Sequence, residues 1–138
     1  MKEVTLRILG EQKHTDGEKN DIELTTLGKF YKKNDIYYIV YDESELSGME
    51  GSTTTLKIEG SKISMKRFGN NNSKLTFEQG KKHRTSYQTP YGNMLMEVVT
   101  RTVDLDISDK GKGNINLDYR LSIGGEVESR NRLSIKIH

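Results

Sequence analysis

The sequence predicts an all-β protein with one domain, residues 1–138, built as a single closed or nearly closed antiparallel β-barrel of about ten strands. Apolar and polar residues alternate along most of the chain, and turn residues interrupt the alternation every 8–12 residues or so. No window has apolar residues at i, i+3, i+4 and i+7, except one short turn around residues 44–49. A closed meander is favoured because the connections are short and closure removes exposed sheet edges.

Each predicted strand is a run in which apolar residues occupy every second position. Successive side chains of a strand point to opposite faces, so each run buries one face and exposes the other to water. Half-polar strands explain why only 32% of the residues are hydrophobic, a fraction that composition alone would associate with disorder. In chain order, the runs are Val4–Ile8, Ile22–Phe30, Tyr37–Tyr41, Thr54–Ile58, Ile63–Met65, Leu75–Phe77, Ile115–Ile123 and Leu133–Ile137.

One further run changes phase in its middle. Apolar residues fall on even positions from Met94 to Val98 and on odd positions from Val103 to Ile107. A β-bulge near residues 99–102 would re-aim the strand face, as barrel corners require. We favour one long bent strand, because no turn residue lies between the two halves; the alternative is two separate strands.

Clusters of turn residues separate the runs. The segment Thr89-Pro90-Tyr91-Gly92 holds the only proline of the chain. At the second position of a type I turn, this proline would preset the backbone angle φ. We interpret this segment as a turn between strands, with a ligand-contacting lip as the alternative. The other clusters are Thr15–Gly17, Lys33–Asp35, Glu59–Ser61, Gly69–Asn72, Gln79–Lys81, Lys110–Gly113 and Gly124–Gly125.

Charge and cysteine content limit the classes of partner. The net charge is +2, from 22 basic and 20 acidic residues, so no strong field favours nucleic acid or an acidic membrane as a partner. The chain has no cysteine, which excludes disulfides, thiolate catalysis and thiolate metal sites. The N-terminal residues alternate polar and apolar rather than forming a signal-peptide core, which predicts a cytoplasmic protein. We expect no metal site and no cofactor.

Two charged residues fall on predicted inner faces. Arg67 shares the face of Ile63 and Met65, and Glu43 follows Tyr41 on its face. A buried arginine needs an acceptor, and Glu43 is the candidate. Alternatively, the strand ends at Met65, or Arg67 extends along the apolar surface to the barrel rim, and Glu43 is a solvated carboxylate at a strand end.

We expect a modest, part-polar pocket inside the barrel that opens at one end and binds a small, partly apolar ligand. Arg67 and Tyr87 would be polar anchors on its wall, with the Thr89–Gly92 turn near a rim. A satisfied interior hydrogen-bond network would produce the same pattern. The candidate ligand-binding residues are Tyr41, Glu43, Arg67, His83, Tyr87 and Tyr91.

Catalysis is the alternative function. Ligand binding is favoured over it because nothing in the sequence selects a reaction. No zinc-protease, calcium-loop, phosphate-loop or nucleophile-elbow motif is present. An enzyme acting on a ligand in the barrel would have to use Glu43 or His83 as general base. A weaker alternative is a module that binds protein or RNA through an outer basic patch, Lys81, Lys82 and Arg84.

A set of short segments occurs in a characteristic order along the chain: Tyr41-Asp42-Glu43, Gly48-Met49-Glu50-Gly51 leading into Thr54-Thr55-Leu56, Arg67-Phe68-Gly69, Phe77, Tyr87 and Thr89-Pro90-Tyr91-Gly92. In these segments and their order the chain resembles the YwiB-like family of uncharacterised small bacterial proteins. The resemblance covers nearly the whole chain, from Val4 to Ile137. It implies a calycin-like, lipocalin-type barrel and no particular activity, since a shared fold is not a shared function.

Overall fold

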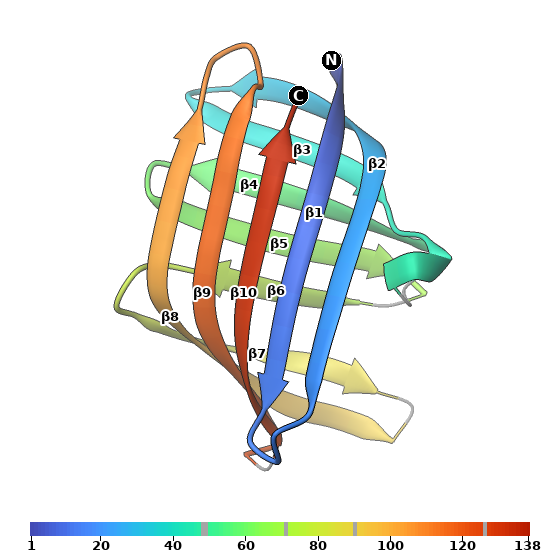
Figure 1. The fold of residues 1–138 in the computed structure, drawn as a ribbon, viewed down its shortest axis with the longest axis vertical. Helices are drawn as coiled ribbons and strands as arrows, with labels where there is room; N and C mark the ends of the chain where they lie inside the picture. The colour runs from blue at the N-terminus through green and yellow to red at the C-terminus, as the bar shows by residue number, and fades with distance from the viewer. Residues whose placement is uncertain (48–49, 71, 90, 126) are drawn as a thin grey trace.

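The computed structural model is one ten-stranded antiparallel sheet curled into a nearly closed barrel (Figure 1). It describes residues 1–47, 50–70, 72–89, 91–125 and 127–138, with only the backbone described for 87–89 and 127. The all-β prediction is confirmed, and the short turn expected around residues 44–49 contains the 3-10 helix η1 (Glu45–Ser47). The strands are β1 (Lys2–His14), β2 (Lys19–Lys33), β3 (Ile36–Asp42), β4 (Ser52–Glu59), β5 (Lys62–Gly69), β6 (Ser73–Phe77), β7 (Lys82–Thr89), β8 (Gly92–Ile107), β9 (Gly113–Ile123) and β10 (Val127–Ile137).

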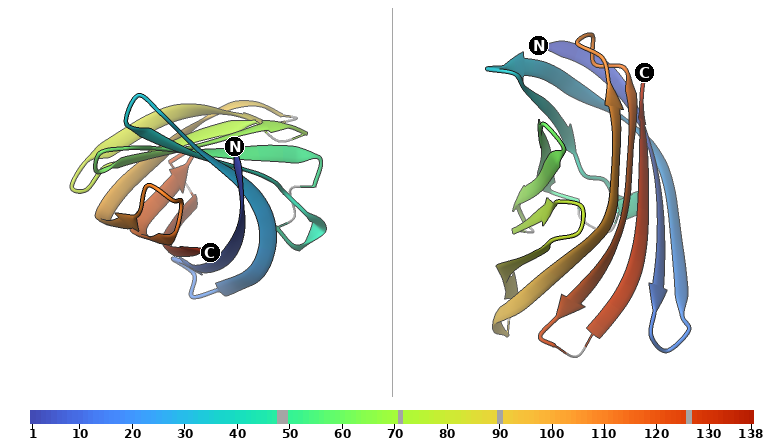
Figure 2. Two further views of the ribbon diagram at one scale, coloured as in Figure 1. Left: turned by 90° about the horizontal axis from the view of Figure 1, so that it is seen from above. Right: turned by 90° about the vertical axis from the view of Figure 1, so that its left-hand side faces the viewer.

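The strand order is a meander joined through its ends. The order is β6-β5-β4-β3-β2-β1-β10-β9-β8-β7, so the first and last strands pair, with Leu6 opposite Ile137. Figure 2 shows the long strands β9, β10, β1 and β2 as one curved wall, crossed by the shorter strands of the facing wall. β6 and β7 are the two ends of the sheet. The barrel is therefore nearly closed, with its seam in the middle of the chain.

The phase change in the sequence is a bulge within one strand, as predicted. β8 runs for 16 residues, and its pairing with β9 shifts register between Thr100 and Thr102. The extra residue, Arg101, switches the inward positions from even to odd, so that Val98 and Val103 both contact the interior.

Fully buried apolar side chains concentrate in the half of the barrel that contains both termini. This half is filled by residues of β1, β4, β9 and β10, with Leu6, Leu56, Ile115 and Ile135 all at 0% exposure. Along β1, the inward positions then continue through Ile8 and Gly10 to Gln12, so the alternation becomes polar towards the other end. In the part of the chain that is described, no helix is long and apolar enough to cross a membrane.

The loop after β8 caps the filled end. Gly111 has φ +81°, and a Cβ there would lie 2.7 Å from the ring of Phe30, so glycine allows the loop to sit on that ring. The Tyr37 hydroxyl donates a hydrogen bond to the Asp109 carboxylate, and Lys32 Nζ lies 3.3 Å from the same oxygen. Asp109 thus ties the cap to β2 and β3.

Replacing Asp109 by asparagine is expected to lower the melting temperature at neutral pH and to matter less as pH falls. Hydrogen bonds from Tyr37 and then Lys32 hold the pKa of Asp109 below its usual range. The carboxylate therefore stabilises the fold above its unfolded-state pKa, and this contribution is lost as pH falls through its folded-state pKa. Thermal melts across a pH series measure the effect. D104N is the control, because Asp104 is exposed on β8 and has no ion pair within the described part of the chain. An equal loss for D109N at every pH would contradict the prediction.

Candidate functional site

A cavity of about 560 Å³ occupies the half of the barrel away from the termini. Its size is in the range of small-molecule pockets. Side chains from β1, β2, β3, β5, β6, β8, β9 and β10 form its wall, and η1 lies against it. The apolar part of the wall consists of Ile8, Ile22, Leu24, Leu46, Met65, Leu75, Met96, Leu121, Ile123 and Leu133.

Arg67 points into this cavity and pairs with Glu43, which confirms the inward, paired prediction. Arg67 Nη2 lies 3.4 Å from Glu43 Oε1, and the two side chains are 14% and 4% exposed. Thr54, directly opposite Arg67 on β4, links the two. Its hydroxyl accepts from Arg67 Nε at 3.2 Å and donates to Glu43 Oε1 at 2.6 Å. The charges are thus neutralised within one hydrogen-bonded cluster.

Two tyrosines of the cavity are held in their neutral form. Burial, and next the negative charge of Glu43, raise the pKa of Tyr41 far above its ordinary value. Burial raises the pKa of Tyr119 to about 12, against a small opposing effect of Arg67. The Tyr119 ring packs at 4.7 Å from that of Phe77. Both phenols can therefore serve as hydrogen-bond donors over the whole physiological pH range.

The wall opposite Arg67 carries a smaller polar cluster near the mouth. Asn131 and Ser129 are buried on β10, and Asn131 Nδ2 donates to Ser129 Oγ at 3.1 Å. Gln12 Nε2, on the neighbouring strand β1, donates to the same oxygen at 3.3 Å. Apolar residues therefore line much of the cavity, with one buried polar cluster at Arg67 and another at Asn131 and Gln12.

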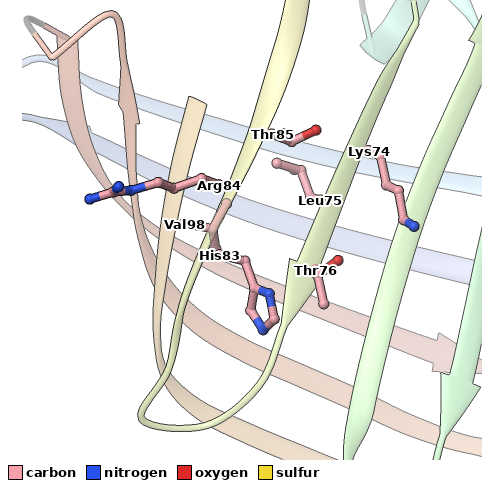
Figure 3. Close-up of a pocket in the computed structure, with 7 residues that line it drawn as sticks. All are labelled: Lys74, Leu75, Thr76, His83, Arg84, Thr85 and Val98. Atoms are coloured by element: carbon pink, nitrogen blue, oxygen red, sulfur yellow. The ribbon is translucent and has the colours of Figure 1, made fainter. Parts of the chain in front are cut away.

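The seam between β6 and β7 holds two smaller pockets, of about 220 and 340 Å³. Leu75 borders the first and the interior cavity, while Arg67 and Ser73 border the second and the interior cavity. Figure 3 shows β6 and β7 diverging, with Leu75 and Thr85 in the space between them. A few side chains thus separate the interior from the outside at this place.

His83 lies at the seam rather than in the main cavity. It borders the smaller seam pocket (Figure 3). Its Nε2 is 3.0 Å from Glu78 Oε1. Hydrogen bonds from Lys81 and then His83 lower the pKa of Glu78. The two predicted general bases, Glu43 and His83, therefore belong to different clusters and are not brought together.

The remaining sequence-predicted residues divide between the cavity and the outside. Tyr41 lines the cavity, whereas Tyr91 is fully exposed. Tyr87 belongs to β7, where it pairs with Met94, but its side chain lies outside the described residues. The predicted Thr89–Gly92 turn connects β7 and β8, and its residue 90 also lies outside them.

Most of the cavity-lining residues were not among the predicted site residues, and Gln12, Ser73 and Leu46 are three of them. Gln12 and Ser73 line the cavity, and Leu46 of η1 covers it with a side chain that is 71% exposed. Gln12 could have been found by extending the alternation of β1 beyond Ile8. Leu46 carries no such signal, because it does not belong to a strand.

Other kinds of site receive little support from the described residues. They contain no group of three or more His, Cys, Asp or Glu side chains that could hold a metal ion. Every member of the outer basic patch has a carboxylate within 4 Å: Lys81 has Glu78, while Lys82 and Arg84 share Glu97. This pairing weakens the field that an acidic partner would meet.

Comparisons with known proteins agree with the predicted resemblance. Residues 6–135 match the model of a family described as a domain of unknown function, DUF1934. The uncharacterized β-barrel protein YwiB of Bacillus subtilis strain 168 is 26% identical over 121 residues, which is 87% of this chain and 82% of that protein. The crystal structure of YwiB superimposes with a TM-score of 0.80 at 20% identity, covering 97% of this chain and 90% of the other.

Proposed function

Because the chain belongs to the DUF1934 family, whose function is unknown, we propose its function from the cavity: non-enzymatic binding of a small, partly apolar ligand inside the barrel. The observation that carries this proposal is a 560 Å³ cavity in which apolar walls surround the buried Arg67–Glu43 cluster. Small-molecule sites commonly combine apolar walls with a few convergent polar groups.

The position of the two candidate bases favours binding over catalysis. Glu43 Oε1 already accepts hydrogen bonds from Thr54 and Arg67, so it is poorly placed to abstract a proton from a ligand. His83 borders the seam pocket and bonds to Glu78. In the binding proposal Arg67 orients the ligand, and Glu43 holds Arg67 in place.

A neutral fluorescent probe, N-phenyl-1-naphthylamine, is expected to bind the native protein stoichiometrically. Leu121→Trp should weaken that binding at least about tenfold, because Leu121 lines the cavity and the larger indole would occupy it. Leu27→Trp is the matched control, since Leu27 is 61% exposed on β2 and does not border the cavity. Fluorescence titration measures both affinities.

Equal affinity of the two tryptophan variants would show that the probe binds elsewhere. Absence of saturable binding to the native protein would remove the binding proposal. Far-ultraviolet circular dichroism of each variant establishes that the barrel is intact before its titration is interpreted.

A further inference from the structure

We infer that the interior cavity is specific for a neutral amphiphile, whose hydrogen-bond acceptor binds Arg67 and Tyr119 while its apolar chain lies along the cavity wall. A carbonyl oxygen of an amide, ester or ketone has the required chemistry. This inference rests on the proposed function and names its ligand class. It follows from two features of the part of the cavity that contains Arg67, Glu43 and Tyr119, called the floor below. Arg67 and Tyr119 have more hydrogen-bond donors than acceptors nearby, and Glu43 balances the charge of Arg67.

The donor surplus is on Arg67 and Tyr119. Nε of Arg67 bonds to Thr54, and Nη2 is directed to Glu43 and to Met65 Sδ. Within the described part of the chain, neither Nη1 of Arg67 nor the Tyr119 hydroxyl has a hydrogen-bond partner. Both residues border the cavity. Neither donor is sealed from solvent, since the buried unpaired side-chain atom among the described residues is Thr100 Oγ1. A ligand that displaced water from these donors without offering an acceptor would leave them unpaired at a cost, so a ligand oxygen placed here would satisfy them.

The charge balance excludes an ionised head group at the same place. Glu43 already neutralises Arg67, and the two side chains are only 4% and 14% exposed. A carboxylate beside Arg67 would leave the buried cluster with a net negative charge, which is expensive in a poorly solvated site. The mouth does not favour an anion either, because the charged residues that border the cavity there are Glu11, Asp21 and Arg132.

A cationic head group is excluded by the burial of Glu43. Its side chain is 4% exposed, and Oε1 already accepts from Thr54 and Arg67. A ligand ammonium that reached Glu43 would also lie next to the Arg67 guanidinium, and like charges at that distance repel. A neutral acceptor therefore remains as the group that complements the floor.

The volume limits the length of the apolar chain. At roughly 30 Å³ for each water-sized atom, the 560 Å³ cavity holds on the order of 15–20 non-hydrogen atoms. A head group with a chain of about ten carbons fits this space.

Three probes of equal chain length test the inference: decanamide, decanoate and decylammonium. Each is titrated at neutral pH against the protein loaded with N-phenyl-1-naphthylamine. Decanamide is expected to displace the probe with an affinity at least about tenfold higher than either charged analogue. Tighter or equal binding of decanoate would overturn the inference, as would failure of all three to displace a probe that binds.

The Glu43→Gln variant is expected to reverse the preference of the cavity for decanamide over decanoate. Removing the Glu43 charge leaves Arg67 unneutralised, so decanoate should now bind at least as tightly as decanamide. Glu11→Gln is the matched control, because Glu11 is an exposed carboxylate that borders the same cavity, and it should keep the preference for decanamide. Unchanged selectivity in a folded Glu43→Gln variant would overturn the inference.

A measurement on the native chain makes the test independent of whether Glu43→Gln folds. Acidification to about pH 4 converts a growing fraction of decanoate into neutral decanoic acid. The apparent affinity of this probe for the protein should therefore rise towards that of decanamide. The affinity of decanamide over the same pH range is the internal control. A parallel change in both affinities would contradict charge selectivity. If the naphthylamine probe itself does not bind, the proposed function fails, which is distinct from failure of the ligand class.

Discussion

Arg67→Ala is expected to lower the free energy of unfolding by about 3–5 kcal/mol, because it leaves a buried carboxylate without its counter-charge. Glu43 is 4% exposed, and its charge partner among the described residues is Arg67, at 3.4 Å. The alanine variant also leaves the Thr54 hydroxyl without the donor that occupies it. Such a loss is a large share of the total stability of a small domain. Urea denaturation followed by circular dichroism measures it.

Two further variants show whether the loss depends on the burial of the ion pair and on the donor geometry of arginine. Arg67→Lys should recover only part of the loss, because an ammonium lacks the forked donors that contact Thr54 and Glu43 together. Arg7→Ala breaks a shorter ion pair, 2.7 Å to Glu23, whose side chains are 51% and 60% exposed. Exposed pairs contribute at most about 1 kcal/mol, so this control should change stability little. A loss below about 0.5 kcal/mol for Arg67→Ala would contradict the role of the cluster.

The barrel could be predicted from sequence because each strand carries its own alternating pattern of apolar and polar residues. Alternation assigns each strand and its inward face, and the phase change from Met94–Val98 to Val103–Ile107 locates the bulge between Thr100 and Thr102. The same alternation offered an inward Arg67 paired with Glu43 as one of its open interpretations, and the structure has that pair. The position of each strand and the side chains on its inward face can thus be read from the sequence of that strand.

The seam could not be predicted in this way, because it depends on the curvature of the whole sheet. β6 alternates like the strands that pair on both sides, with Leu75 and Phe77 inward, whereas β7 (Lys82–Thr89) is polar at nearly every position; both are ends of the sheet. Where two strands diverge, alternation no longer says which residues reach the interior. This explains why His83 borders a seam pocket instead of joining Glu43 in the main cavity.

The site was only partly predictable for a related reason. The buried cluster needs Thr54 between Arg67 and Glu43, and the register of β4 against β5 supplies it. That register is set by the hairpin turn and by neighbouring strands, so the sequence of β5 alone does not contain it. Tyr119 alternates in phase with Leu117 and Leu121 in the sequence, but the place of its hydroxyl in the cavity depends on the distances across the barrel.

Phe77→Ala is expected to lower the free energy of unfolding by about 3–5 kcal/mol, through a cavity in the core. Phe77 is 0% exposed, and its ring lies 4.7 Å from the ring of Tyr119 on the opposite wall. β6 is only five residues long and is an end strand of the sheet. Its attachment therefore depends on the buried side chains Leu75 and Phe77 more than on backbone hydrogen bonds.

Phe68→Ala is the matched control, because Phe68 is 50% exposed at the end of β5 and should change stability by about 0.5 kcal/mol or less. Phe77→Leu should fall between the two, since it keeps part of the buried volume. Urea melts of all three variants measure the difference. Equal, small effects of Phe77→Ala and Phe68→Ala would mean that β6 is dispensable for the barrel, and that the sheet is stabilised without contacts across its seam.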